Sequence, residues 1–132
     1  MIGIGIDTNV LLCALVNKAD PGQTERAQRA IRENSPVFLN NIVLSEFVWT
    51  CKYTYAMERA AIHRLLHDIA NTAEFRFAHP ETIARAVAGY GSRMSDFADW
   101  LIGETNLEHG CNITLTFDKG AAKDAAFEPV PA

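Results

Sequence analysis

Five acidic residues stand beside stretches that are expected to be buried: Asp7, Glu46, Asp96, Asp99 and Asp118. Asp7 follows the apolar run IGIGI, and Asp118 follows ITLTF. Carboxylate oxygens without cysteine or histidine ligands at hand favour Mg²⁺ or Mn²⁺. If folding brings several of these groups together, they repel one another unless a cation neutralises them. The acids therefore predict a divalent-metal site.

Most of these acids also have a plain structural explanation. Asp7 and Asp118 stand where a helical segment begins, so each could be an N-cap that accepts backbone N–H groups. Asp96 and Asp99 are three residues apart at the start of a helix, where the helix dipole favours both a cap and an N3 acid. Ser95 could be the cap instead, which would release both carboxylates. Each of these interpretations stays open at this point.

Glu46 is harder to explain as a structural residue. Its neighbours three and four positions away include Ile42, Val43 and Trp49, so it interrupts a predicted helix that is mostly apolar. We therefore expect Glu46 to be buried, and a buried carboxylate needs a cation, a metal or a proton. The alternative is a buried ion pair with an arginine.

The segments that must position these acids alternate between strand and helix. Strands are predicted over 2–6, 36–39, 74–77 and 112–117, with a weak strand over 127–130. Helices are predicted over 8–16, 24–33, 42–55, 57–70, 80–90 and 96–109, with a short helical turn over 119–124. Such alternation indicates an α/β fold, in which helices cover both faces of a short central parallel sheet. Because the carboxyl ends of parallel strands meet at one edge, Asp7 and Asp118 are expected at the same rim.

Composition limits the class of protein. The 132 residues suffice for one domain with a core, which we expect to span 1–132. A net charge of −4 argues against a simple basic surface for nucleic acid, although not against a metal-dependent enzyme. The three cysteines are scattered, and the sequence shows neither a membrane-spanning segment nor a secretion signal. We therefore expect a cytoplasmic protein without a membrane anchor.

Four segments in order, IDTNVLL, LSEFVW, SDFADWLIGETNLEHGC and LTFDKGA, resemble the PIN-domain ribonucleases. The nearest likeness is to VapC-type toxins of type II toxin–antitoxin pairs, and it runs from residue 1 to about residue 128. The resemblance implies a three-layer α/β/α PIN-like fold as a single domain. It also implies an endoribonuclease that hydrolyses RNA phosphodiester bonds with Mg²⁺ or Mn²⁺. The implied partners are a cognate VapB-like antitoxin, the RNA substrate and a second copy of the chain.

The same resemblance assigns roles to individual residues. The implied catalytic and metal-binding residues are Asp7, Glu46, Asp99 and Asp118. The implied accessory residues are Asp96, Asn9 and Thr116, of which Asn9 would orient Asp7.

The chain departs from the family pattern at Trp100 and Gly103, where small or aliphatic residues are usual. Trp100 could pack at the rim or contact substrate, and the sequence leaves both open. Lys119 could contact a phosphate, although a solvated surface lysine is the simpler interpretation.

Two other functions fit parts of the sequence. A haloacid-dehalogenase-type phosphatase also begins with a strand that ends in aspartate, but it needs a second aspartate where this chain has Asn9. A non-catalytic binding module could keep the scaffold, although it would have no reason to retain the acids. Activity on RNA or on a small phosphate ester would separate these alternatives.

Overall fold

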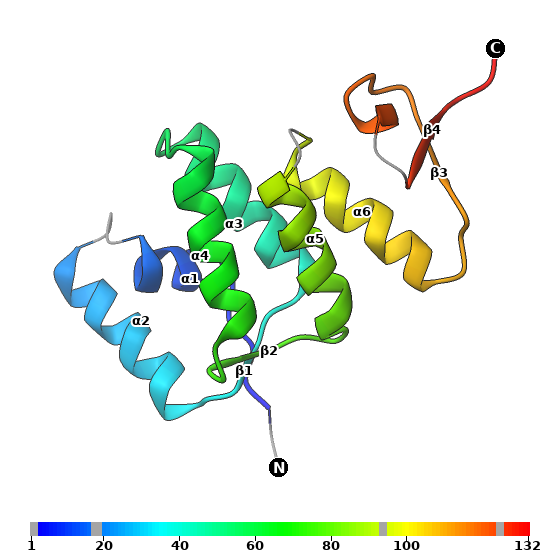
Figure 1. Ribbon diagram of the computed structural model, residues 1–132. Coiled ribbons are helices and arrows are strands. Elements are labelled where there is room, and N and C mark those ends of the chain that lie inside the picture. Colours follow the sequence, from blue (N-terminus) through cyan, green and yellow to red (C-terminus); the bar gives the residue numbers. More distant parts are fainter. Residues whose placement is uncertain (1–2, 17–19, 93–94, 124–125) are drawn as a thin grey trace. The chain divides into compact units, whose positions relative to one another are not determined.

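The computed structural model describes residues 3–16, 20–92, 95–123 and 126–132. Its helices are α1 (Thr8–Leu15), α2 (Pro21–Glu33), α3 (Asn41–Tyr53), α4 (Arg59–Asn71), α5 (Pro80–Ser92), α6 (Phe97–Glu108) and the 3-10 helix η1 (Ala121–Lys123) (Figure 1). Its strands are β1 (Val37–Phe38), β2 (Phe75–Arg76), β3 (Thr114–Thr116) and β4 (Phe127–Pro129). Each predicted helix has a counterpart, with ends that differ by a few residues. None of the described helices has the length and apolar character that crossing a bilayer requires.

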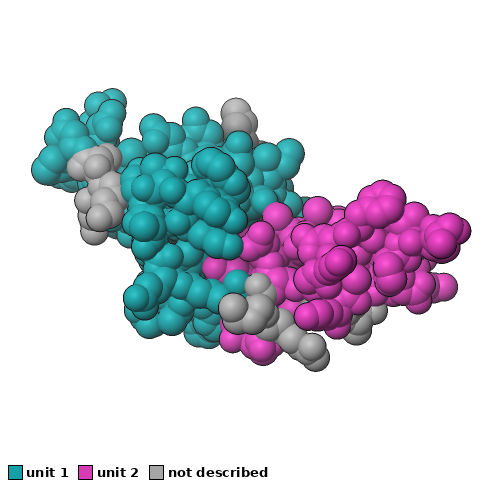
Figure 2. Space-filling model, turned by 90° about the horizontal axis from the view of Figure 1, so that it is seen from above, with its two compact units in different colours: residues 1–80 teal, residues 81–132 magenta. Residues whose placement is uncertain are grey.

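The chain divides into two compact units, residues 1–80 and residues 81–132, which carry different colours in Figure 2. Each unit contains helices and one parallel strand pair. The α/β class and the parallel pairing are therefore as predicted. That residues 1–132 act as one domain stays a prediction.

In the first unit, α1 packs against α2 and α3, and α3 packs against α4. Helix α1 is apolar on most sides, and its buried residues run without a break from Leu11 to Ala14. Helix α3 begins after Asn40, whose side chain accepts the Val43 N–H at 2.9 Å. Its buried side consists of Val43, Leu44, Phe47, Val48 and Cys51.

Helix α2 begins at Pro21, three residues earlier than predicted. Asp20 caps the helix by accepting the Gly22 N–H at 3.0 Å. Proline is well suited to the first helical position because it has no N–H to satisfy there. Residues 17–19, part of the loop expected before this helix, lie outside the described residues.

The parallel pairs are short. Strands β1 and β2 pair with Val37 opposite Phe75 in the first unit, and β3 and β4 pair with Thr114 opposite Phe127 in the second. The strand predicted over 2–6 is reduced, in its described part, to a single bridge between Gly5 and Phe38. Glycine weakens a strand because it loses more backbone entropy and offers no side chain to pack, and two of these five residues are glycines.

In the second unit, several side-chain contacts join α5 to α6. The rings of Tyr90 and Phe97 meet edge to face, with centroids 5.7 Å apart. Arg85 Nε donates to Glu104 Oε1 at 3.0 Å. The hydroxyl of Thr82, which is buried, donates to the Glu108 carboxylate. These links fix the helix that carries Asp96 and Asp99 at its start.

Candidate functional site

Asp7 stands at the N-terminus of α1 as its cap. Its Oδ1 accepts the Val10 N–H at 3.1 Å, and its backbone is extended, with φ −91° and ψ 177°. The side chain is exposed. The capping interpretation of Asp7 is thus correct, and it leaves Oδ2 without a partner among the described residues.

Glu46 is exposed, so the prediction that it is buried is wrong. The neighbours that suggested burial are themselves on the surface, because Ile42 is 71% and Trp49 is 60% exposed. Apolar residue types therefore misidentified the buried face of α3, since an apolar side chain on a protein surface is common. No arginine pairs with Glu46 among the described residues, so the predicted alternative of a buried ion pair is not found either.

A hydrogen bond joins Glu46 to the start of α1. Thr8 Oγ1 donates to Glu46 Oε1 at 2.6 Å across a separation of 38 residues. Because Thr8 directly follows Asp7, this bond places the Glu46 carboxylate beside the helix start that Asp7 caps. Thr8 received no role in the sequence analysis. The only signal that pointed to it was its place between Asp7 and Asn9.

Asn9 is exposed in the first turn of α1 and lines a pocket between α1 and α2. The bond that holds the Asp7 carboxylate comes from the Val10 N–H. Within the described part of the chain, Asn9 makes no hydrogen bond to Asp7. The orienting role predicted for Asn9 therefore falls to Val10 and to the helix start itself.

In the second unit, Asp96 is the N-cap residue of α6, and Asp99 lies in its first turn. The Asp96 carbonyl accepts the N–H groups of Asp99 at 3.0 Å and Trp100 at 3.2 Å. The Asp96 side chain makes no capping hydrogen bond. Asp96 is exposed and Asp99 is half-buried. The cap position falls to Asp96 and not to Ser95.

Asp118 is held by the turn that follows it. Its Oδ1 accepts the N–H groups of Gly120 at 2.7 Å and Ala121 at 3.1 Å, at the start of η1. Thr116 Oγ1 accepts the Asp118 N–H at 3.0 Å. Asp118 is therefore a local cap, as the structural interpretation predicted, and Thr116 fixes the backbone from which its side chain projects.

Ser95 connects the start of α6 with the turn after Asp118. Its hydroxyl donates to the Gly120 carbonyl, at a donor–acceptor distance of 3.5 Å. Asp96 directly follows Ser95, and Asp118 lies two residues before Gly120. Lys119, in the same turn, is exposed.

Trp100 and Gly103 are explained by packing within the second unit. A Cβ on Gly89 would lie 2.4 Å from the Trp100 ring, so the indole rests directly on the backbone of α5. A Cβ on Gly103 would lie 2.8 Å from Phe127. Of the two roles left open for Trp100, the structure shows packing. The indole N–H is buried without a hydrogen-bond partner among the described residues.

The oxygen ligands suit a hard cation such as Mg²⁺ or Mn²⁺. Asp7, Glu46 and Asp118 each use one carboxylate oxygen in the bonds above, and the other has no partner in the part of the chain that is described. Within either unit, the described residues bring no three His, Cys, Asp or Glu side chains together as a metal-holding group.

Comparison with protein families identifies one match. The sequence pattern of the PIN-domain family matches residues 4–128. The search of curated proteins found no match. The match covers nearly the whole chain and agrees with the six helices and short parallel strands of the structure. The chain therefore belongs to the PIN-domain family, whose fold is generally that of a nuclease.

Proposed function

We propose that the protein is a metal-dependent endoribonuclease that acts as the toxin of a toxin–antitoxin pair. The observation that carries the proposal is the bond from Thr8 to Glu46, which brings an acid of α3 to the helix start that Asp7 caps. Membership of a family of nucleases supports the same conclusion. It also speaks against the phosphatase alternative.

The proposed metal ligands and catalytic residues are Asp7, Glu46, Asp99 and Asp118, with Asp96, Asn9 and Thr116 as accessory residues. When bound, Mg²⁺ would supply an acidified water and stabilise charge on the phosphoryl oxygens. The protein's own part is to hold the carboxylates still. Val10 orients Asp7, Thr8 orients Glu46, and the turn after Asp118 orients that residue.

Several further properties belong to the same proposal. Residues 1–132 act as a single PIN domain, and the protein works in the cytoplasm. Its partners are a VapB-like antitoxin, the RNA substrate and a second copy of the chain. The support for these properties is the likeness of the four sequence segments to VapC-type toxins.

The experiment compares two capping aspartates of the first unit. Asp7→Asn removes one metal ligand, whereas Asp20→Asn changes the equivalent cap of α2. Asparagine caps a helix as well as aspartate does, so both variants should fold. We expect Asp7→Asn to lower Mg²⁺-dependent RNA cleavage by about 10²–10³-fold and to relieve growth inhibition on expression. We expect Asp20→Asn to behave as wild type.

Three results would overturn the proposal. The first is Asp7→Asn protein that cleaves RNA at the wild-type rate. The second is wild-type protein that hydrolyses a small phosphate ester but not RNA, which would favour a phosphatase. Wild-type protein that does neither would point to the non-catalytic binding module.

A further inference from the structure

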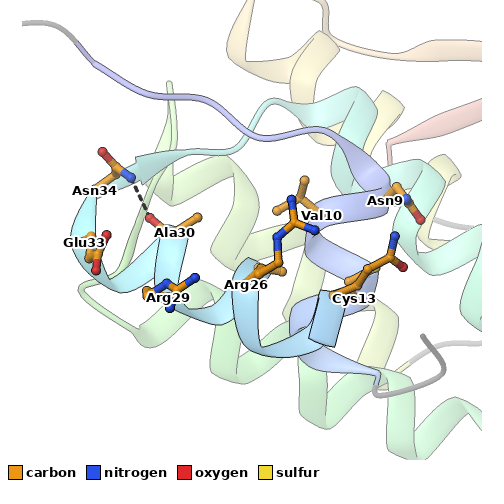
Figure 3. Close-up of a pocket in the computed structure, with 10 residues that line it drawn as sticks. Asn9, Val10, Cys13, Arg26, Arg29, Ala30, Glu33 and Asn34 are labelled. Carbon is orange, nitrogen blue, oxygen red and sulfur yellow. Dashed lines mark hydrogen bonds between the residues drawn. The ribbon is translucent and has the colours of Figure 1, made fainter. Parts of the chain in front are cut away.

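A pocket of about 460 Å³ lies between α1 and α2 in the first unit. Figure 3 shows Arg26 reaching from α2 toward α1, with Asn9 near one end of the pocket and Asn34 near the other. Arg29 and Glu33 also line it. The remaining lining includes small apolar side chains, so the pocket offers no large apolar wall to anchor a peptide.

The pocket is locally positive in a chain whose net charge is −4. Its lining contains two arginines and one acid. Arg26 and Arg29 are exposed, and neither guanidinium has a hydrogen-bond or ion-pair partner within the described residues. A guanidinium presents several N–H donors in a planar fork that matches phosphate oxygens. The side-chain amide of Asn9 adds a further donor.

The pocket begins close to the proposed catalytic residues. Asn9 is two residues after Asp7, and the lining continues along α1 through Val10 to Cys13. A helix rises about 1.5 Å per residue, so the near end of the pocket lies within about one turn of the Asp7 cap. An anion held there would be a close neighbour of any phosphodiester at Asp7.

We propose that the α1–α2 pocket binds a backbone phosphate of single-stranded RNA, next to the phosphodiester that is cleaved. Arg26 and Arg29 supply the charge, and Asn9 supplies a hydrogen bond on the side nearest Asp7. The identity of the ligand as RNA rests on the proposed function. The positive lining of the pocket and its position beside Asp7 do not depend on that function.

The test uses two double variants that remove equal charge. Arg26→Gln/Arg29→Gln alters the pocket, whereas Arg32→Gln/Arg64→Gln removes two other exposed arginines of the same unit that do not line it. Affinity for a fluorescent single-stranded RNA is measured in EDTA over a range of salt concentrations. Because metal is absent, binding is read without cleavage, and thermal melting confirms that each variant is folded.

We expect the pocket variant to bind RNA roughly tenfold more weakly than wild type. The slope of log K against log salt should fall in magnitude by about 0.7, the value for one neutralised phosphate on a single strand. The control variant should change both quantities much less.

The measurements distinguish an error in the phosphate-binding proposal from an error in the nuclease proposal. If the two double variants lose RNA affinity equally, the pocket is not the phosphate-binding site, even if wild-type protein cleaves RNA. If the pocket variant keeps its RNA affinity but loses affinity for an acidic partner protein, the proposal is wrong and the ligand of the pocket is a protein. A selective loss of RNA affinity supports the pocket, even if wild-type protein shows no Mg²⁺-dependent cleavage.

Discussion

The two units place their acids in different ways. In the first unit, Glu46 is tied to Thr8 across 38 residues of sequence, so its position depends on the packing of α1 against α3. In the second unit, the Asp118 carboxylate accepts N–H groups from Gly120 and Ala121, two and three residues further on. The position of one acid is thus a product of tertiary packing, and that of the other is largely local. Disturbing the packing should therefore affect the first unit's acids more.

The strongest test of the comparison asks whether the two units serve one reaction. Asp7→Asn and Asp99→Asn are each expected to lower Mg²⁺-dependent RNA cleavage by about 10²–10³-fold. Residues that act as one catalytic unit are strongly non-additive, so the double variant should be little worse than either single variant. Cleavage rates of the three variants give the answer. Losses that multiply would mean that the two acids act independently.

The second test concerns the packing that supports α6. Gly89→Ala would place a Cβ 2.4 Å from the rigid Trp100 ring. We expect it to destabilise the protein by about 1–3 kcal/mol, although alanine normally favours a helix. Urea unfolding measures the change. Gly5→Ala is the control in the first unit, because its Cβ would meet only the Phe38 carbonyl, at an ordinary 3.7 Å. Equal stability of Gly89→Ala and wild type would contradict the packing argument.

The third test removes the long-range bond in the first unit. Thr8→Val keeps the shape of the side chain but loses the hydroxyl that donates to Glu46. RNA cleavage should fall about tenfold, since misplacing a carboxylate through its supporting partner commonly costs that much. Thr8→Ser should restore activity.

Thr116→Val is the matched change in the second unit, where Asp118 keeps its bonds from Gly120 and Ala121. We therefore expect a smaller loss of cleavage than in Thr8→Val. A larger loss in Thr116→Val would reverse the comparison between the units.

The smallest expected effect is a pH dependence of stability in the first unit. Burial raises the pKa of the Cys51 thiol from 9.0 to about 11. Between these values the unfolded state has lost the proton that the folded state keeps, so the free energy of unfolding falls as pH rises. The fall should be on the order of 1 kcal/mol for each pH unit between these two values.

Urea unfolding of wild type and Cys51→Ala at pH 8 and pH 11 isolates this contribution. The wild type should lose more stability than the variant over this interval. Cys111→Ala serves as the control in the second unit, because Cys111 is exposed. If wild type and Cys51→Ala lose stability equally, the cause assigned to the pH dependence is wrong.

The candidate residues show where sequence reasoning succeeded. Asp7 and Asp118 were correctly identified as potential helix caps, because a cap depends on residues within one turn of the chain. Asp96 occupies the predicted cap position of α6 and Asp99 lies in its first turn, although the Asp96 side chain makes no capping hydrogen bond. The convergence of the acids at one metal stays a prediction.

The sequence did not predict correctly which side of α3 packs against the rest of the chain. Ile42 and Trp49 have the residue types of a core, yet both are exposed, and Glu46 lies on the surface with them. The core of α3 uses Val43, Leu44 and Phe47 instead. Because the exposed side of this helix also carries large apolar residues, residue type alone does not separate the two sides.

The helices, their ends to within a few residues and the α/β class follow from the amino-acid sequence, because periodicity and capping depend on residues a few positions apart. Tertiary packing sets which side of α3 is buried, brings Thr8 to Glu46 and places Trp100 on Gly89. The physical reason is that these contacts join segments distant in the chain, so each depends on how whole helices pack.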